Sequence, residues 1–475
     1  MIPITEYAGR DVAVYGLGRT GLAAARALKA GKAKVHAWDD NEASRARAEA
    51  EGIPVSDLNK RDWQNFAALV LSPGIPLTHP QPHRLVRLAQ MTNVPVVGDM
   101  ELFARAVQSL PERGRPKVIG ITGTNGKSTT TALIGHILKE CGLDVHVGGN
   151  IGTGVLDLPA LHANAYYVLE LSSYQLDLVK SLRCDVSVLL NMSPDHLDRH
   201  GDMSGYVAAK KRIFNNQTRG DTAVVAVDDK HTQCIAMELA GRGDVRLARV
   251  SSEFALGRGV SAIDGKLFDS LASNAVRVGD LGESATLPGR HNWQNAAAAY
   301  AACRALGLDP GRIFAAITTF PGLAHRMEQV GEIDGVRFVN DSKATNAQAA
   351  EQALRAYPRV YWIAGGRAKE GGIEPLLPLM DHVAKAYLIG EAADDFARTL
   401  DGKTAHETTG TLEKAVADAF RDAKASGDEN PIILLSPACA SFDQFKDFEA
   451  RGDSFREAVE ALGGDALRPV MQESA

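Results

Sequence analysis

The sequence predicts an α/β protein built from three domains in a row, each containing a parallel sheet. Short apolar strands, such as residues 12–15, 34–38 and 67–71, alternate with helical segments, which is typical of parallel sheets covered by helices on both faces. A linker-like stretch at 110–117 (LPERGRPK) and the pair Pro321-Gly322 divide the 475 residues into lengths that suit separate domains. We therefore expect domains at residues 1–110, 111–322 and 323–475.

The composition is that of an ordinary globular protein, with 45% hydrophobic and 23% charged residues and a net charge of −6. This charge gives no electrostatic reason to bind nucleic acid or an anionic membrane. No apolar run reaches the length of a membrane span, and the first residues lack a signal-peptide pattern, so no membrane insertion is expected. The five cysteines are scattered without a CxxC pair, which predicts a reduced cytosolic protein without zinc or disulfides.

The first domain is expected to be Rossmann-like. Its first strand (12–15) runs into GLGRTG (16–21) and an alanine-rich helix, the second strand (34–38) ends at Asp39 and Asp40, and strands at 67–71 and 94–97 follow. GxGxxG after a strand, with an acid about twenty residues on, matches a dinucleotide fingerprint. This geometry holds any pyrophosphate against a helix N-terminus, so an NAD-dependent oxidoreductase and a UDP-sugar enzyme both stay open at this point.

The second domain opens on a phosphate-binding pattern of the P-loop ATPase type. A strand from Val118 leads into a turn that is followed by Lys127, Ser128 and a helical segment. The strict P-loop pattern requires a glycine where Ile121 stands, so this loop is a shortened relative whose glycines are Gly120, Gly123 and Gly126. Backbone N–H groups and the helix dipole favour an anion here, with Lys127 reaching terminal phosphates and Ser128 offering its hydroxyl to magnesium.

Further candidates follow the strands expected at 166–169, 186–190 and 222–227. Glu170 stands at a strand end, where an acid facing a P-loop is a natural magnesium ligand, and His196 follows the next strand end. Lys210 lies on a predicted helix beside two more cations, which by itself indicates a solvated basic face. The segment 251–287 is turn-rich and has no clear pattern, and a helix is expected at about 292–306. Asn292 is either a helix cap or, with Asn295, a nucleotide contact.

The third domain again reads as Rossmann-like, with strands at 336–339, 360–364, 386–389 and 432–435. His325 and Arg326 stand at its start, where a planar guanidinium suits a phosphate. Three loops follow strands: NDSKATN (340–346), the loop that contains Lys369, and SPACASFDQFKDF (436–448). Because these strands are expected in one parallel sheet, the three loops should converge at one edge and form a small-molecule site.

Taken together, these motifs resemble the Mur ligase family, ATP-dependent amide-forming enzymes of peptidoglycan precursor synthesis. The resemblance covers essentially the whole chain, and within the family it is strongest to the members that add D-glutamate. It rests on motifs that occur in one order, namely GLGRTGLA, ITGTNGKST, GGNIG, LELSSYQL, NMSPDHLDRH, YVAAK, GRHNWQN, AHRME, NDSKATN and SPACASFDQFKDF. It implies a monomer in the bacterial cytoplasm, acting on UDP-N-acetylmuramoyl-L-alanine, D-glutamate and ATP.

The resemblance also implies roles for individual residues. UDP-substrate contacts are expected at Arg19, Thr20, Asp39, Asp40, Gly74 and Asn150. ATP contacts are expected at Gly123, Thr124, Asn125, Gly126, Lys127, Ser128, Thr129, Asn292, Asn295, His325 and Arg326. Two Mg²⁺ ions would be held by Ser128, Glu170, His196 and Lys210, the lysine as a carbamate, and D-glutamate by Thr345, Lys369, Ser441 and Phe448. The expected catalytic residues are Lys127, His196 and Lys210.

The motifs are also compatible with two other functions. An NAD-dependent oxidoreductase would show an NADH-dependent absorbance change without any need for ATP. A nucleotide-gated binding protein would bind ATP without forming an amide. Within the ligases, the sequence leaves open the stereochemistry of glutamate, a folylpolyglutamate-type reaction and another Mur acceptor.

Overall fold

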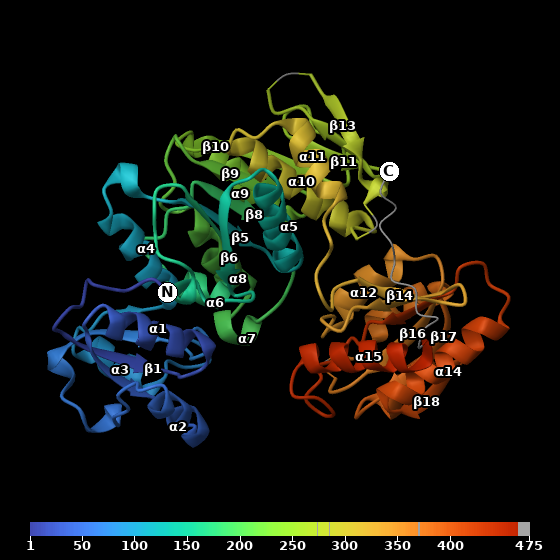
Figure 1. Cartoon of the computed structure of the whole chain (residues 1–475), viewed down its shortest axis with the longest axis horizontal. Coiled ribbons are helices and arrows are strands. Elements are labelled where there is room, and N and C mark those ends of the chain that lie inside the picture. The colour runs from blue at the N-terminus through green and yellow to red at the C-terminus, as the bar shows by residue number, and fades with distance from the viewer. Residues whose placement is uncertain (273, 285, 369–370, 464–475) are drawn as a thin grey trace. The chain divides into compact units, whose positions relative to one another are not determined.

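The computed structural model describes residues 1–463 except 273, 285, 369 and 370. The α/β class is confirmed, with three mainly parallel sheets joined by helices (Figure 1). By contacts the chain divides into two compact units, one of Met1–Asp280 with Gln294–Ile317, and one of Leu281–Trp293 with the chain from Thr318 on. The first unit contains two of the three sheets, so the division into two units does not follow the three predicted domains. The domain boundaries at 110/111 and 322/323 remain predictions.

The first sheet has four parallel strands in the order β2-β1-β3-β4. These are β1 (Asp11–Tyr15), β2 (Lys34–Trp38), β3 (Phe66–Leu71) and β4 (Val96–Val97), joined by α1 (Arg19–Ala30), α2 (Glu42–Ala50), η1 (Leu58–Lys60), η2 (Trp63–Asn65) and α3 (Arg84–Met91), with α4 (Asp99–Ser109) after them. The strand predicted at 94–97 is shorter than expected. Val94 donates its N–H to Ala89 in the turn after α3, and Pro95 has no N–H to donate to a sheet.

The second sheet has nine strands in the order β13-β12-β11-β10-β9-β8-β5-β7-β6. Neighbouring strands from β11 to β6 are parallel, and β12 and β13 are antiparallel additions. The strands are β5 (Lys117–Thr122), β6 (Asp144–Gly149), β7 (Ala165–Glu170), β8 (Val186–Leu189), β9 (Thr222–Ala226), β10 (Arg246–Ser251), β11 (Val260–Ile263), β12 (Lys266–Asp269) and β13 (Val276–Asp280).

Helices α5 to α11 belong to this part of the chain. They are α5 (Lys127–Glu140), α6 (Ser173–Asp177), α7 (Leu197–His200), α8 (Met203–Lys211), α9 (Lys230–Arg242), α10 (Arg290–Ala305) and α11 (Pro310–Thr318), with short 3-10 turns η3 (Glu112–Gly114), η4 (Val155–Asp157), η5 (Arg212–Phe214) and η6 (Leu281–Glu283). None of the helices that the structure describes is long and apolar enough to cross a membrane. The segment 251–287, which carries no clear sequence pattern, holds β11 to β13. These strands are only four or five residues long and β13 has no buried residue, so no long apolar run marks them.

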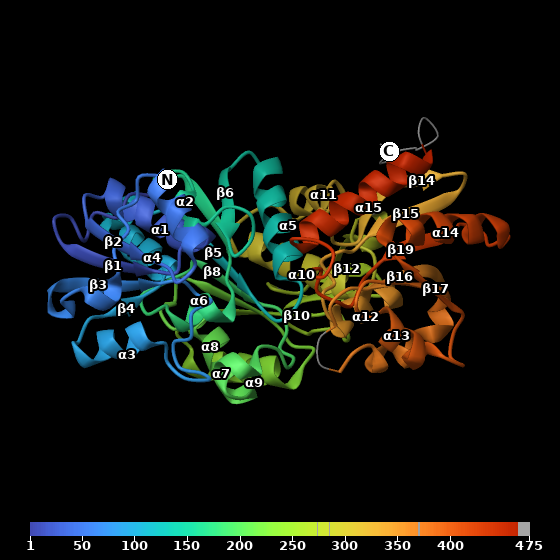
Figure 2. The same cartoon turned by 90° about the horizontal axis from the view of Figure 1, so that it is seen from below.

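The sheet of the second unit has the order β14-β15-β19-β16-β17-β18, with β14 antiparallel to β15 and the rest parallel. Its strands are β14 (Glu328–Ile333), β15 (Val336–Asn340), β16 (Val360–Gly365), β17 (Val383–Ile389), β18 (His406–Gly410) and β19 (Ile432–Leu435), and its helical segments are α12 (Ala347–Ala356), η7 (Glu374–His382), α13 (Ala393–Leu400), α14 (Leu412–Ala425) and α15 (Phe448–Gly463). Alternate residues of β16 face opposite sides, with Trp362 packing among α12, η7 and α13, and Ile363 among α14 and α15. Helices therefore cover both faces (Figure 2).

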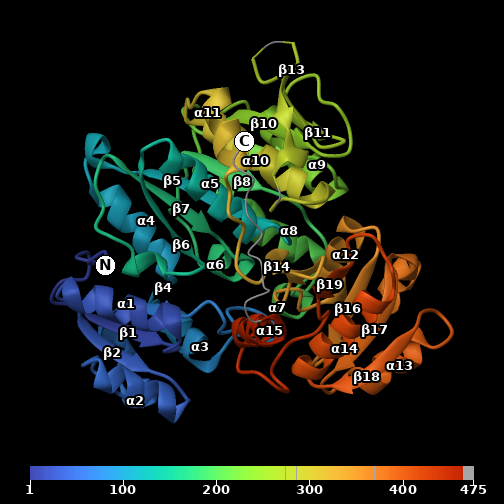
Figure 3. The ribbon, with the colours of Figure 1, turned by 45° about the vertical axis from the view of Figure 1, so that its right-hand side comes forward.

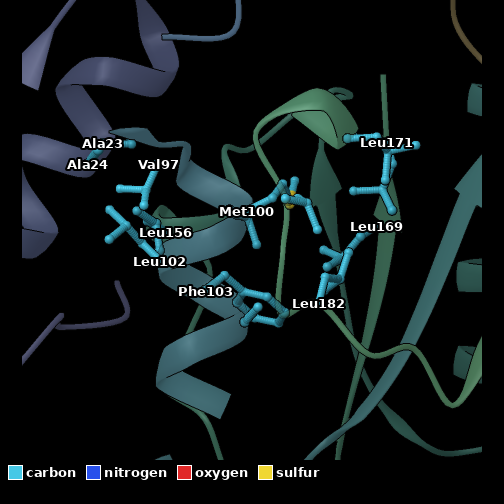
Figure 4. Close-up of a cluster of buried hydrophobic side chains, with 14 of the residues drawn as sticks. Ala23, Ala24, Val97, Met100, Leu102, Phe103, Leu156, Leu169, Leu171 and Leu182 are labelled. Atoms are coloured by element: carbon cyan, nitrogen blue, oxygen red, sulfur yellow. The ribbon is translucent and has the colours of Figure 1, made fainter. Parts of the chain in front are cut away.

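Helix α4 connects the two sheets of the first unit through one continuous core (Figure 3). Its Met100, Leu102 and Phe103 lie between Ala23 of α1 and Leu169 of β7 (Figure 4). The ring of Phe103 lies 5.5 Å from that of Tyr167 in β7. This shared core is the physical reason why the first two predicted domains form one compact unit.

A buried acid also anchors α4. Glu101 is 1% exposed, and its carboxylate accepts hydrogen bonds from the N–H groups of Lys180 (2.8 Å) and Ser181 (2.9 Å) and from Arg105 Nε (2.9 Å). Burial raises the pKa of Glu101, but these hydrogen bonds outweigh it and hold the pKa below its ordinary value of 4.5. The carboxylate thus fixes α4 to the segment between α6 and β8.

We expect Glu101→Gln to lower the free energy of unfolding by about 2 kcal/mol at neutral pH, because an amide nitrogen cannot accept these hydrogen bonds. Since the folded pKa is depressed, the stabilisation is complete above pH 4.5 and is lost as the pH falls through the folded pKa. Urea unfolding of the wild type and the variant from pH 7 to pH 3 measures this difference. Glu49→Gln, at an exposed position of α2, is the matched control and should match the wild type. A pH-independent difference would contradict the role of the charge.

Candidate active site

The phosphate-binding loop joins β5 to α5 as the sequence predicts. Gly126 is the N-cap of α5 and adopts a left-handed conformation with φ of +81°, and Gly123 has φ of +153°. A Cβ on Gly126 would lie 2.2 Å from Asn295 Oδ1. Glycine is therefore required at Gly126 both for its backbone angle and because Asn295 of α10 lies against the loop.

Lys127 lies across this loop. Its Nζ donates hydrogen bonds to the carbonyl oxygens of Thr124 (2.6 Å) and Gly123 (3.0 Å). The ammonium is therefore at the N-terminus of α5, where an anion would be favoured by the helix dipole.

Ser128, the next residue of α5, is hydrogen-bonded to Glu170 at the end of β7. Its hydroxyl donates a 2.5 Å hydrogen bond to Glu170 Oε2, while Glu170 Oε1 accepts one of 2.7 Å from Asn150 Nδ2. Ser128 and Glu170 are 5% and 2% exposed. The parallel pairing of β5 with β7 brings these two oxygens together, because both strands end at the same edge of the sheet.

Lys210 of α8 lies on the other side of the loop, and it is not the solvated basic face that its neighbours indicate. It is 2% exposed, its Nζ donates to Gly123 O at 2.7 Å, and it lies 4.8 Å from the ring centre of Tyr206. Burial, and then the positive charge of Lys127, hold the pKa of Lys210 well below its ordinary value of 10.5. The carboxylates of Asp195 and Glu170 act on this pKa in the opposite direction, but less strongly.

His196 is the N-cap of α7 and adopts the left-handed conformation, with φ of +53°. Its Nδ1 lies 3.1 Å from the hydroxyl of Tyr174, and its Nε2 lies 3.4 Å from Asp195 Oδ2. The side chain is 45% exposed. By contrast, the nearby His200 is buried against Ser173, and burial lowers its pKa to about 4, so it is neutral at physiological pH.

Lys127, His196 and Lys210 line one cavity of about 350 Å³ in the first unit, whereas Ser128 and Glu170 are not part of its described lining. Its walls combine the first loops of the N-terminal sheet with the phosphate-binding loop and the strand ends of the second sheet. The lining residues are Arg19, Thr20, Pro73, Gly74, Lys127, Asn150, Ser172, Ser173, Tyr174, Gln175, Asp195, His196, Tyr206 and Lys210. Seven of them are residues that the sequence analysis predicts: Arg19, Thr20, Gly74, Lys127, Asn150, His196 and Lys210.

Asp39 and Asp40 are outside the described lining of this cavity. They follow β2, where Asp39 Oδ2 accepts a 2.6 Å hydrogen bond from Leu17 N and Asp40 Oδ2 accepts one of 2.9 Å from Tyr15 Oη. Leu17 lies within the glycine-rich turn after β1, so Asp39 holds that turn. Their contact with a UDP group stays a prediction.

The two asparagines of α10 occupy different places. Asn295 faces Gly126, as described, whereas Asn292 is buried and donates from Nδ2 to Pro288 O (2.9 Å). Because α10 begins at Arg290, Asn292 lies inside its first turn and is not the cap. Beside Asn295, Gln294 lies 3.4 Å from Asn191 Nδ2, and Asn191 in turn accepts from Asn125 N of the phosphate-binding loop.

In the second unit the predicted convergence of loops is confirmed for the described residues. β15, β19 and β16 are consecutive parallel neighbours, and Arg367 and Ala440 exchange backbone hydrogen bonds between the loops after β16 and β19. Ser342 Oγ donates to Phe448 O, and Lys343 Nζ lies 3.6 Å from the ring centre of Phe448. Thr345 follows in the first of these loops and Ser441 is buried in the last. Lys369 lies outside the described residues.

His325 lies next to Asn340, the last residue of β15, where the first of these loops begins. It is 6% exposed, its backbone N–H donates to Glu328 Oε2 (2.8 Å), and its ring Nδ1 lies 3.1 Å from Asn340 Nδ2. Arg326 follows it, close enough to act on Asp341, a buried carboxyl whose pKa burial raises to about 7. Contacts of His325 and Arg326 with a nucleotide stay predictions.

The cavity wall also includes residues that are not predicted from the sequence. Tyr174 hydrogen-bonds His196, and the hydroxyl of Tyr206 lies 3.1 Å from Thr124 Oγ1 in the phosphate-binding loop. Asp195 and Ser173 complete this wall. The only signal for them in the sequence is that they stand within the motifs LELSSYQL, NMSPDHLDRH and YVAAK, because a tyrosine or serine on a short helix has no pattern of its own.

A P-loop-like cradle beside a buried serine–glutamate pair and a buried lysine defines a nucleotide-dependent enzyme of the α/β class. Comparison with known proteins gives the family. A family model described as "Mur ligase middle domain" matches residues 121–303, and one described as "Mur ligase, glutamate ligase domain" matches residues 325–439.

Curated relatives match over nearly the whole chain. The UDP-N-acetylmuramoylalanine–D-glutamate ligase of Caulobacter vibrioides (strain NA1000 / CB15N) is 60% identical over 98% of this chain and 99% of its own length. The ligase of the same name from Rhodospirillum rubrum is 52% identical over 97% of each chain. The chain therefore belongs to the Mur ligase family.

Solved structures agree on the fold. UDP-N-acetylmuramate–alanine ligase from Thermotoga maritima has a TM-score of 0.57 at 17% identity, covering 95% of this chain and 99% of its own. MurF from Acinetobacter baumannii has a TM-score of 0.58 at 18% identity, covering 96% and 93%. At these identities the likeness concerns the fold alone.

Proposed function

We propose that this protein is an ATP-dependent ligase that joins D-glutamate to UDP-N-acetylmuramoyl-L-alanine in peptidoglycan precursor synthesis. The observation that carries the proposal is the 60% identity, over 98% of the chain, to a UDP-N-acetylmuramoylalanine–D-glutamate ligase. The phosphate-binding loop with Lys127, Ser128 and Glu170 supports it, because amide formation from a carboxylate needs a phosphoryl donor.

The chemistry follows from the poor reactivity of a carboxylate. A carboxylate oxygen of the L-alanine residue attacks the γ-phosphorus of ATP, the bond to the β,γ-bridging oxygen breaks, and ADP leaves. The amine of D-glutamate then adds to the carbonyl carbon of the acyl phosphate. The tetrahedral adduct loses a proton from nitrogen and expels inorganic phosphate to give the amide. The protein supplies no nucleophile in this sequence, so its residues act by positioning and by electrostatics.

The residues around Glu170 fit Mg²⁺. A carboxylate and a hydroxyl whose oxygens lie 2.5 Å apart, both buried beside a phosphate-binding loop, are hard oxygen ligands of the kind that Mg²⁺ shares with nucleotide phosphates. Bound there, Mg²⁺ would neutralise phosphate charge. We assign Ser128, Glu170 and His196 as its protein contacts and extend the proposal to two ions.

Lys210 is proposed to act as a carbamate. A buried ammonium is costly, so the neutral amine, the form that adds CO₂, is favoured at this position. The carbamate would turn a cation into an anionic oxygen ligand beside Gly123 and Tyr206.

The remaining assignments follow the cavity and the loops. Lys127 and Asn295 would contact the nucleotide at the loop, and Arg19, Thr20 and Gly74 would contact the UDP-substrate, with Asn150 next to the muramoyl group. In the second unit the loops after β15, β16 and β19 would hold D-glutamate through Thr345, Lys369, Ser441 and Phe448.

The test is phosphate release from ATP and UDP-N-acetylmuramoyl-L-alanine with a panel of single amino acids. We expect the fastest phosphate release and amide formation with D-glutamate, at one phosphate per amide. The kcat/KM for L-glutamate should be lower by about 100-fold or more, because a misplaced carboxylate loses its charge-assisted hydrogen bonds. Faster amide formation with a different amino acid would move the protein to another Mur reaction. A change in NADH absorbance without ATP would favour the oxidoreductase instead.

A further inference from the structure

A cluster of two histidines and an aspartate lies at the end of the nine-stranded sheet where β6 and β7 begin. Asp144 and His146 are two residues apart on the edge strand β6, so their side chains point to the same face. His162 comes from the loop before β7, where its carbonyl accepts the N–H of Ala165, the residue that pairs with Asp144 in the sheet. Strand pairing thus brings together three residues from two segments.

The ligand atoms of the three residues lie within 4.8 Å of one another. His162 Nε2 is 2.9 Å from Asp144 Oδ2, and His146 Nε2 is 3.5 Å from Asp144 Oδ1. Ligands at about 2.0 Å from a tetrahedral zinc ion are about 3.3 Å apart. The distances of 2.9 and 3.5 Å between the ligand atoms of this cluster are close to that value.

The burial and hydrogen bonding of these three side chains are compatible with metal binding. His146 Nε2 is buried and makes no hydrogen bond among the described residues, and Asp144 Oδ1 lies 3.5 Å from it. In the tautomer protonated at Nδ1, the lone pair of Nε2 is available to a metal. The side chain of His146 is 13% exposed, and those of His162 and Asp144 are 47% and 50% exposed. A metal would therefore be anchored on the inner side and open to water on the outer side. The ring of His146 packs against Tyr167, with centroids 5.1 Å apart, which fixes its orientation.

We propose that Asp144, His146 and His162 form a binding site for a divalent transition metal, with Zn²⁺ as the best fit. Two imidazoles and one carboxylate match the ligand preferences of Zn²⁺, whereas Mg²⁺ prefers oxygen ligands throughout. The site is separate from the site around Glu170, because the six residues of strand β6 from Asp144 to Gly149 span about 20 Å before Asn150, which hydrogen-bonds Glu170. The metal would tie the segment before β7 to the edge strand β6.

The test uses the untagged full-length protein, freed of metal, and titrates it with Co²⁺ in the absence of nucleotide. We expect the visible absorption of tetrahedral Co²⁺ at one equivalent, removed by one equivalent of Zn²⁺. His162→Ala should weaken Co²⁺ binding by about 100-fold, because it removes one of three ligands. His231→Ala, an exposed histidine of α9, is the matched control and should bind as the wild type does.

Two further variants distinguish Co²⁺ binding at this site from Co²⁺ binding at the proposed magnesium site. Glu170→Gln should keep the Co²⁺ absorption, because the magnesium site is elsewhere, and Asp144→Asn should lose it while keeping the shape of the side chain. His162→Ala should also keep ligase turnover, which shows that it folds. Equal Co²⁺ affinity in His162→Ala and His231→Ala, or a wild type without the tetrahedral absorption, would overturn the proposal.

Discussion

Replacing Lys127 by alanine is expected to lower kcat for ADP formation by about 1,000-fold or more, because the ammonium at the phosphate-binding loop is lost from the developing charge of phosphoryl transfer. Its Nζ lies 2.6 and 3.0 Å from the carbonyl oxygens of Thr124 and Gly123, which fixes it at the N-terminus of α5. Affinity for the UDP-substrate should change by no more than about 3-fold, since the lysine acts on the phosphoryl group rather than on the sugar nucleotide.

Coupled-enzyme detection of ADP, with calorimetric titration of UDP-N-acetylmuramoyl-L-alanine, measures both quantities. Lys139→Ala is the matched control, because Lys139 stands exposed in the last turn of the same helix. Normal turnover in Lys127→Ala would remove the lysine from the reaction. An equal loss in both variants would indicate damage to α5 instead.

Replacing Lys210 by alanine is expected to lower kcat by about 100-fold or more, because it removes the proposed carbamate from the metal site. Short carboxylic acids such as acetate or formate should restore activity at least about 10-fold in this variant, since each supplies a carboxylate that fits the vacated space. The wild type should not respond to them. The rescue distinguishes a lost anion from lost packing, which matters because Lys210 is 2% exposed and packs against Tyr206.

Steady-state kinetics with and without acetate, and mass spectrometry of the wild type under CO₂ for the carbamate, test this role. Lys211→Ala is the control, because the neighbouring Lys211 forms a surface ion pair with Glu238. Full activity of Lys210→Ala without any added acid would exclude Lys210 from the site. A strong loss that no acid restores would support a structural role for the buried lysine.

The strands and the phosphate-binding loop could be predicted because their signals are local. β1, β2, β5, β16 and β19 are short apolar runs that end in glycine, acid or polar turns, and the structure places each within about a residue of the prediction. The sequence carries no clear signal for β6, β13 and β18, because these partly exposed strands contain polar residues and lack a continuous apolar run. β11 is mostly buried but, like β12, is only four residues long. The joint core of the first two domains was missed for a related reason. An amphipathic helix such as α4 shows an apolar face but not which two sheets that face will fill.

The fold class, the phosphate-binding loop from Gly123 to Ser128 and the family follow from local patterns and from the order of the motifs along the chain. Which side chains meet in space depends on how the chain packs. Lys210 has the pattern of a solvated face, yet the packing of α8 buries it against Gly123. Ser128 and Glu170, 42 residues apart, share a 2.5 Å hydrogen bond because β5 and β7 are parallel neighbours. The triad of Asp144, His146 and His162 arises in the same way. Burial and proximity depend on how distant segments pack, and no local pattern encodes them.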